Sequence, residues 1–239
     1  MKAIVLTCDR YRAMTDHMIL QYERLWPDHP FRFRIPFQDL GGENSDRREY
    51  VKSPAPIAAT ALALISDLDD EEWIYWCIDD KYPVQIVVDK AKSFLADLDR
   101  APDMSGLLFC RCRELLTYAE RNVNPLPRLN SFRDAYLERK SWAQIWLHQF
   151  LRVKVIRHFF SHVPADLRAA KDLDEIKRGI PKPRELRLFV TEDNFAVFGE
   201  STSRGEITQN CYDSIRQTNI ALPPWFARSN GEVLLMGKL

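Results

Sequence analysis

An uninterrupted apolar run that ends on two acids is the feature that most constrains the fold of this chain. Residues 73–78 read Trp-Ile-Tyr-Trp-Cys-Ile, and Asp79 and Asp80 follow directly. Six apolar residues without alternation are typical of a strand that is covered on both faces, as in the centre of a parallel α/β sheet. Ligands of such sheets bind where the strands end. The sequence therefore predicts a site for a metal and a nucleotide here, with a solvated, helix-capping loop as the alternative.

Adjacent acids in a crevice need a partner, because two negative charges repel each other where water is scarce. A cation, a hydroxyl donor or basic side chains would offset the charge of Asp79 and Asp80. We expect at least one of these partners to lie beside the two acids.

The segments around this run alternate between strand and helix patterns. This alternation predicts a mostly parallel sheet with helices on both faces, up to about residue 115. Residues 41–56 are polar, basic and contain proline, so they are expected to form a loop. The predicted strands are residues 2–8, 31–35, 73–78 and 106–110. The predicted helices are one with an apolar stripe from Met14 to Leu25, which Pro27 stops, and two over residues 57–68 and 87–98.

We expect one domain over residues 1–239. The second half of the chain lacks the regular alternation of strand and helix patterns. An irregular loop is predicted at residues 119–141, followed by a long helix whose apolar stripe runs from Trp142 to Phe160. Later segments are predicted as a lysine- and aspartate-rich stretch at residues 169–182, strands at 186–190 and 195–198, and a polar tail at 201–219.

The charge and the cysteines limit the classes of partner and the compartment. Lys plus Arg and Asp plus Glu both number 34, so the overall charge does not call for nucleic acid. The five cysteines are odd in number, which favours reduced thiols and the cytoplasm. Cys110 and Cys112 lack a second pair at zinc spacing and are interpreted as packing residues. Without a signal peptide or an apolar run long enough to span a bilayer, membrane contact is expected to be peripheral at most.

Phosphate binding by a glycine-rich backbone loop is not indicated. The predicted first strand leads into Thr7-Cys8-Asp9-Arg10, which matches neither the P-loop nor the dinucleotide-binding pattern. The charge of a phosphorylated ligand would have to be met by a cation and by side chains. The candidates for that role are Arg10, Arg47, Arg48 and Lys52.

In these features the chain resembles the GT-A glycosyltransferases of bacterial or phage type. The resemblance covers about residues 2–115 and is carried by the strand that ends at Asp9, the polar segment before residues 57–68, and residues 73–84 with their acid pair. Residues 144–151 are more weakly similar to the helix that lines the acceptor side in some bacterial members. The resemblance implies a Rossmann-like GT-A fold, in which residues 1–115 bind a nucleotide sugar and residues 116–239 form an irregular acceptor side.

The resemblance also implies roles for the acids. Asp80 would coordinate Mn²⁺ or Mg²⁺ at the diphosphate of the donor, and Asp79 would assist it or contact the ribose. Lys81 stands where the second acid of a D-x-D signature is expected. A metal-independent variant, in which Lys81 neutralises the phosphate, therefore stays open. Asp9 and Arg10 would face the nucleoside, and Arg48 and Lys52 would be further donor contacts.

An inverting transferase needs a base to accept the proton of the acceptor hydroxyl. The candidates are Glu192, Asp193 and Asp166, with His158 and His162 behind them. Glu192 and Asp193 follow a strand-like run and are slightly preferred, although a solvated acid pair is equally consistent with the pattern. The two histidines are four residues apart without a third metal ligand, which favours solvated side chains.

Aromatic residues offer a further contact with sugars. Trp142 and Trp146 share the apolar stripe and are interpreted as core residues. Trp225 follows two prolines and is expected to be exposed near an entrance.

The leading functional hypothesis is a glycosyltransferase that moves a sugar from a nucleotide-sugar donor to a glycan, a lipid-linked acceptor or a small acceptor. One alternative is a non-catalytic module that binds nucleotide sugars or serves assembly with a degenerate site. The other is a nucleotidyltransferase, a class that usually carries a glycine-rich, basic loop after the first strand. Such a loop does not occur in this sequence.

Overall fold

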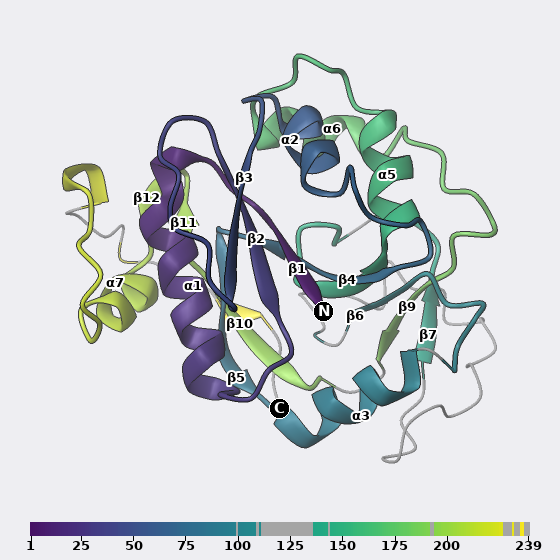
Figure 1. Ribbon diagram of the computed structural model, residues 1–239, viewed down its shortest axis with the longest axis horizontal. Coiled ribbons are helices and arrows are strands. Elements are labelled where there is room, and N and C mark those ends of the chain that lie inside the picture. Colours follow the sequence, from purple (N-terminus) through teal and green to yellow (C-terminus); the bar gives the residue numbers. More distant parts are fainter. Residues whose placement is uncertain are drawn as a thin grey trace.

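A central sheet of eight strands organises the computed structural model, which describes residues 1–98, 100–108, 110, 136–142, 144–191, 194–226, 231 and 235–236. Helices cover both faces of this sheet (Figure 1). The strand order is β3 (Arg48–Lys52), β2 (Arg32–Phe37), β1 (Lys2–Leu6), β4 (Trp73–Ile78), β8 (Gln149–Arg152), β6 (Gly106–Leu108), β9 (Leu188–Thr191) and β7 (Tyr136–Arg139).

Most strands of the sheet share one direction. β1 pairs in parallel with β2 and β4, β2 with β3, and β6 with β9. The two exceptions are β8, which runs antiparallel between β4 and β6, and β7, which is antiparallel to β9. The predicted Rossmann-like α/β class with a mostly parallel sheet is confirmed. We call the side on which β1, β2, β3, β4, β6 and β9 end the carboxyl edge.

Burial on both faces explains why the sequence of β4 lacks alternation between apolar and polar residues. All six of its residues are buried, and they divide between two hydrophobic clusters. Tyr75 and Cys77 pack in the first cluster with α1 (Arg12–Leu25) and α3 (Val88–Leu98). Ile74 and Trp76 pack in the second cluster with α2 (Ile57–Leu64) and α5 (Val153–Ser161). Both faces of the strand therefore select apolar side chains.

Smaller elements lie outside the central eight-stranded sheet. β5 (Lys81–Ile86) starts directly after the acid pair and joins β10 (Ala196–Glu200) and β13 (Leu235–Met236) in a three-stranded sheet. β11 (Thr202–Ser203) pairs with β12 (Glu206–Ile207). The remaining elements are η1 (Asp9–Tyr11), α6 (Ala170–Ile176), α7 (Gln209–Ile215) and η2 (Pro224–Phe226).

Most of the predicted elements are confirmed, with ends that differ by a few residues. They are the strands β1, β2, β4, β6, β9 and β10 and the helices α1, α2 and α3.

The predicted helix from Trp142 to Phe160 is wrong in its first half. Residues 144–147 form turns, and Gln144 has a positive φ of 69°. Residues 149–152 form β8, all buried, and only residues 153–161 are helical. A strand that is buried on both faces has no alternation, so its apolar residues merge with the stripe of the following helix and imitate one long helix.

Three further segments are more regular than predicted. β3 lies within residues 41–56, which were expected to be a loop, and β7 lies at the end of residues 119–141. Helix α7 lies within the polar tail, where the Thr208 side chain accepts a hydrogen bond from the N–H of Cys211 as an N-cap. Residues 111–135 lie outside the described residues.

Cys8, Cys77, Cys110 and Cys211 are free cysteines, and Cys112 lies outside the described residues. Within the described ranges, no helix combines the length and the apolar character that crossing a bilayer requires.

Candidate functional site

The connections of β1 and β4 create a topological switch point at the carboxyl edge. The chain leaves β1 through α1, which packs in the first hydrophobic cluster, and it reaches β4 through α2, which packs in the second. The two strands are neighbours, yet their helices lie on opposite faces of the sheet (Figure 1). In open α/β sheets, ligands bind in the crevice that such a switch point favours. We call the space next to the residues after Leu6 and Ile78 the crevice.

Asp79 is held at the switch point by the end of β1. The Thr7 hydroxyl donates a hydrogen bond to Asp79 Oδ2 over 2.6 Å, and the Asp79 N–H donates to the carbonyl oxygen of Leu6 over 3.3 Å. The Thr15 hydroxyl in turn donates to Thr7 Oγ1 over 2.9 Å. Burial raises the pKa of Asp79 to about 7; the charge of Asp80 adds to this rise, and the Thr7 hydrogen bond opposes it.

Asp80 lies in a different environment. Its Oδ2 accepts a hydrogen bond from Lys81 Nζ over 2.8 Å, and Lys81 also lies 3.6 Å from Glu200 Oε1. Its backbone oxygen accepts from the N–H of Ser201 over 2.7 Å, which ties the acid pair to the end of β10. Asp80 Oδ1 is buried and has no hydrogen-bond partner among the described residues. A buried carboxylate oxygen in that state has unused capacity to accept a proton donor or a cation.

The acid pair has both kinds of partner that its sequence required, a hydroxyl donor in Thr7 and a basic side chain in Lys81. In the part of the chain that the structure describes, no group of three or more His, Cys, Asp or Glu residues could hold a metal ion. Mg²⁺ commonly binds through one or two carboxylates together with substrate phosphates. The unpartnered Asp80 Oδ1 fits that mode, in which a phosphorylated ligand and water would supply the other ligands.

Asp9 holds a loop in place with its carboxylate. Its Oδ2 accepts backbone N–H donors of Gln38 over 3.2 Å, Asp39 over 2.7 Å and Leu40 over 3.0 Å. Burial acts to raise the pKa of Asp9, but these N–H groups outweigh it and lower the pKa below its ordinary value. The carboxylate oxygens of Asp9 are therefore engaged by the backbone of the loop after β2.

Arg10 is exposed in η1, beside the C-terminal segment. Its guanidinium carbon lies 5.8 Å from the ring centroid of Trp225, and the rings of Tyr11 and Phe226 lie 5.8 Å apart. Trp225 is 53% exposed, as predicted. The pKa of Tyr11 is raised first by burial; the charge of Arg10 opposes the rise, and those of Asp79 and Asp80 add to it. The acid pair thus lies near enough to η1 to act on it electrostatically.

The basic residues in and next to β3 lie at opposite ends of this strand. Arg48 begins the strand and forms an ion pair with Asp16 over 2.7 Å. Arg47 donates to the backbone oxygen of His29, before β2 begins. Lys52 ends the strand at the carboxyl edge. It is exposed there, and its ammonium group donates a hydrogen bond to the backbone oxygen of Gln38. Four residue steps along a strand span about 13 Å, so Lys52 lies on the side of the crevice and the two arginines do not.

Of the predicted bases, Asp166 lies within the described residues and is not brought into contact with the acid pair. Asp166 is exposed in the loop between α5 and α6, and within the described residues no hydrogen bond or ion pair connects it with Asp79 or Asp80. Glu192 and Asp193 lie outside the described residues, while the preceding Thr191 ends β9 at the carboxyl edge.

His158 in α5 and His162, which directly follows this helix, both contact backbone oxygens. His158 Nε2 lies 2.9 Å from the oxygen of Pro181, and His162 Nδ1 lies 2.8 Å from that of His158. Trp142 is buried in the core, as predicted, with 2% exposure. Trp146 is half-buried, and its indole N–H donates to the Asp174 carboxylate over 2.7 Å.

Sequence reasoning missed Thr7 and Glu200 as neighbours of the acid pair. Thr7 is 72 residues away from Asp79 along the chain, and Glu200 meets Lys81 only because β5 and β10 pair side by side. The one available signal was the position of Thr7 directly after the predicted first strand. Glu200 had no comparable signal.

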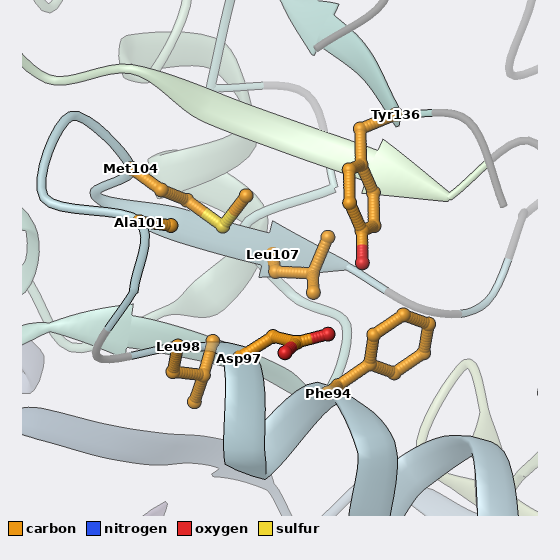
Figure 2. Close-up of a pocket in the computed structure, with 7 residues that line it drawn as sticks. All are labelled: Phe94, Asp97, Leu98, Ala101, Met104, Leu107 and Tyr136. Carbon is orange, nitrogen blue, oxygen red and sulfur yellow. The ribbon is translucent and has the colours of Figure 1, made fainter. Parts of the chain in front are cut away.

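A small apolar pocket lies elsewhere, between α3, β6 and β7 (Figure 2). Its lining is mostly apolar, and Asp97 and the ring of Tyr136 point into it. Asp97 Oδ2 is buried without a hydrogen-bond partner among the described residues, and burial raises the pKa of this carboxyl group. The cavity measures about 10 Å³, roughly the space of one water molecule. It is too small for a nucleotide.

No family model matches this chain, and no curated protein matches it. Among solved structures, the galactosyltransferase LgtC in complex with donor and acceptor sugar analogues is similar, with 11% identity over 98% of this chain and 86% of that one and a TM-score of 0.41. TarS from S. aureus shares 13% identity over 90% of this chain and 38% of its own, with a TM-score of 0.45. The 2-C-methyl-D-erythritol 4-phosphate cytidylyltransferase of Francisella tularensis shares 10% identity over 91% of this chain and 99% of its own, with a TM-score of 0.43. Values this low assign no activity.

Proposed function

We propose that the crevice between β1 and β4 binds a nucleotide-sugar donor and that the protein transfers the sugar to a glycan, a lipid-linked acceptor or a small acceptor. The observation that carries this proposal is the acid pair at the switch point, with Asp79 bonded to Thr7 and Asp80 Oδ1 without a partner. A site with unused carboxylate capacity and no glycine-rich loop suits a diphosphate that arrives with a divalent cation.

Transfer of a sugar leaves a nucleoside diphosphate that gains negative charge as the bond to the sugar breaks. Mg²⁺ or Mn²⁺, when bound, would stabilise that charge as a Lewis acid. Asp80 would hold the ion through Oδ1, and Asp79 would support it or contact the ribose. Lys52, at the end of β3, would contribute positive charge at the same edge.

Lys81 supports metal dependence more than metal independence. Its ammonium group already lies 2.8 Å from Asp80 and 3.6 Å from Glu200, so its charge is balanced by two carboxylates. A lysine in that position orients Asp80 Oδ2 and leaves Oδ1 for a cation. In the metal-independent alternative, Lys81 would have to exchange these carboxylates for a phosphate.

The base that deprotonates the acceptor is proposed to be Glu192 or Asp193, because β9 ends with Thr191 at the carboxyl edge. Asp166 is the second choice. Substitutions Glu192→Gln, Asp193→Asn and Asp166→Asn test this assignment. The variant that lacks the base should lose most of its transfer rate while it keeps its affinity for the donor.

A thermal-shift panel with UDP, GDP, CDP, dTDP and their common sugars, each with Mn²⁺ or with EDTA, tests the proposal. A ligand that binds the folded state at 100 times its Kd stabilises it by about 2.7 kcal/mol. We expect one nucleotide class to raise the unfolding temperature, with Mn²⁺ required. A full transfer rate in excess EDTA would instead establish the metal-independent variant through Lys81. No shift with any nucleotide would contradict the proposal.

Asp80→Ala tests the role of the acid pair, and Asp70→Ala is its matched control. Asp70 lies shortly before β4 begins, at the end of the strand away from Asp80, and forms an ion pair with Arg157 over 2.7 Å. Asp80→Ala should abolish the nucleotide-dependent shift, whereas Asp70→Ala should retain it. A nucleotide sugar that binds without transfer or hydrolysis would favour a non-catalytic binding module. Formation of a nucleotide sugar from a sugar phosphate and a nucleoside triphosphate would identify a nucleotidyltransferase.

A further inference from the structure

An exposed aromatic side chain from the C-terminal segment lies beside the loop that begins at the crevice. Trp225 belongs to η2, and its ring centroid lies 5.8 Å from the guanidinium carbon of Arg10 in η1. The indole is 53% exposed, although most large apolar side chains of the described residues are buried. An exposed indole beside a guanidinium group offers a ligand a flat aromatic face and N–H donors at the same place.

The fold fixes this ring in place. Phe226, its neighbour, is fully buried in the first hydrophobic cluster and packs on the ring of Tyr11 at 5.8 Å. Further back along the segment, Ser214 in α7 lies 2.9 Å from His17 Nε2 and accepts a hydrogen bond from Gln21 over 3.1 Å. Both partners belong to α1. The segment is thus attached to α1 and η1, and Trp225 keeps its position beside Arg10.

The chain connects Trp225 to the acid pair through η1. Thr7 donates a hydrogen bond to Asp79, η1 begins two residues later, and its Arg10 lies beside Trp225. The loop after β2 is joined to η1 as well, because the Asp9 carboxylate accepts a hydrogen bond from the N–H of Leu40, another strongly exposed apolar residue. The rim next to the proposed diphosphate position thus carries a flat ring and a guanidinium group.

We propose that Trp225 and Arg10 form the wall of the donor site on which the nucleobase stacks. This inference rests on the proposed function, and it assigns a donor contact to the last part of the described chain. A nucleobase has a flat π face that stacks on an indole, whatever the base. The N–H donors of Arg10 would meet a base oxygen or the first phosphate group. A sugar ring of the acceptor and a lipid surface are the competing occupants of the same ring.

Calorimetric titration of the full chain with nucleotides, in the presence of Mn²⁺, tests the proposal. The probes are UDP, GDP, CDP and dTDP, with inorganic pyrophosphate as the probe that lacks a base. Stacking on one aromatic ring changes affinity for a base by about 5- to 150-fold. Trp225→Ala should weaken the best nucleoside diphosphate within that range and leave pyrophosphate unchanged. Trp225→Phe should retain most of the affinity, because phenylalanine also offers a flat ring.

Leu40→Ala is the matched control, since it truncates another exposed apolar side chain, in the loop after β2. It should bind every probe like the natural chain. Equal nucleotide affinity in Trp225→Ala and the natural chain would overturn the inference alone. An equal loss of affinity for the nucleotide and for pyrophosphate would also overturn the inference, because such an effect would not depend on the base.

The competing occupants have their own readouts. A loss confined to the KM for the acceptor would assign the ring to the acceptor, and a loss confined to binding of vesicles of phosphatidylglycerol and phosphatidylcholine would assign it to lipid. Either result overturns base stacking. If the natural chain binds no nucleoside diphosphate at all, the proposed function itself fails, and the inference fails with it.

Discussion

Asp79 and Asp80 are adjacent in the sequence, yet their surroundings give the two carboxylates different properties. Asp79 is removed from water, which raises the pKa of its carboxyl group to about 7 although the hydrogen bond from Thr7 opposes the rise. Asp80 accepts a hydrogen bond from Lys81 through Oδ2, and its Oδ1 has no partner among the described residues. Asp79 therefore titrates within the physiological range.

The raised pKa of Asp79 predicts a pH-dependent stability. A carboxyl group whose pKa is higher in the folded state stabilises the fold fully below its unfolded value of 3.8, and this contribution is lost as the pH rises through about 7. The loss is at most about 4 kcal/mol. Asp79→Asn keeps an acceptor for Thr7 but does not titrate. In EDTA, the unfolding temperature of the natural chain should fall relative to Asp79→Asn between pH 4 and pH 8; parallel curves would contradict this account.

Asp97 offers a second test at the residue scale. Its side chain is buried in an apolar pocket with Oδ2 unpartnered among the described residues, and Oδ1 accepts a long hydrogen bond from Arg100 over 3.5 Å. Replacing a buried polar group that lacks a partner by an apolar one removes its desolvation cost. Asp97→Leu should raise the free energy of unfolding by about 1 to 2 kcal/mol, and more at pH 8 than at pH 4. Denaturant titration measures this, with Arg100→Ala as the control; a destabilised Asp97→Leu would show that the carboxylate is needed.

At the scale of elements, the sequence predicts those segments whose periodicity has one explanation. Helix α1 has a clear stripe from Met14 to Tyr22, and β4 is long and apolar without interruption. β8 and α5 could not be separated, because Gln149–Arg152 is buried on both faces and continues the stripe of the helix. β3 was missed because its five residues include Arg48, Glu49 and Lys52. Such a strand is recognised only through its pairing with β2.

The junction of β5 and β10 gives a test at this scale. A Cβ atom at Gly199 would lie 2.6 Å from Tyr82 Cζ. Tyr82 has little room to move, because it is buried, accepts a hydrogen bond from Asn210 and packs on His17. Gly199→Ala should therefore lower the free energy of unfolding by about 1 to 3 kcal/mol.

Gly179→Ala is the matched control for this substitution. A Cβ atom there meets nothing closer than the Ile176 oxygen at 3.4 Å, so chemical denaturation should show little change. Equal effects of the two substitutions would contradict the packing of Tyr82 against β10.

For the whole molecule, the site is the product of topology more than of any local motif. Thr7 follows β1, Asp79 follows β4 and Glu200 ends β10; the switch between β1 and β4 brings the first two together. The sequence predicted the acid pair and its position at a strand end. It did not predict that Asp9 is occupied by backbone donors or that Arg48 lies away from the crevice, because both depend on the register of β2 and β3.

Hydrogen–deuterium exchange with the nucleotide that binds best, in the presence of Mn²⁺, tests the central claim most directly. If the donor occupies the crevice between β1 and β4, backbone amides should gain protection in residues 7–11 and 78–81, and the same nucleotide should protect neither segment in Asp80→Ala. The amides around the pocket of Asp97 should stay unchanged. Protection confined to other segments, or equal protection in Asp80→Ala, would contradict a donor site at the acid pair.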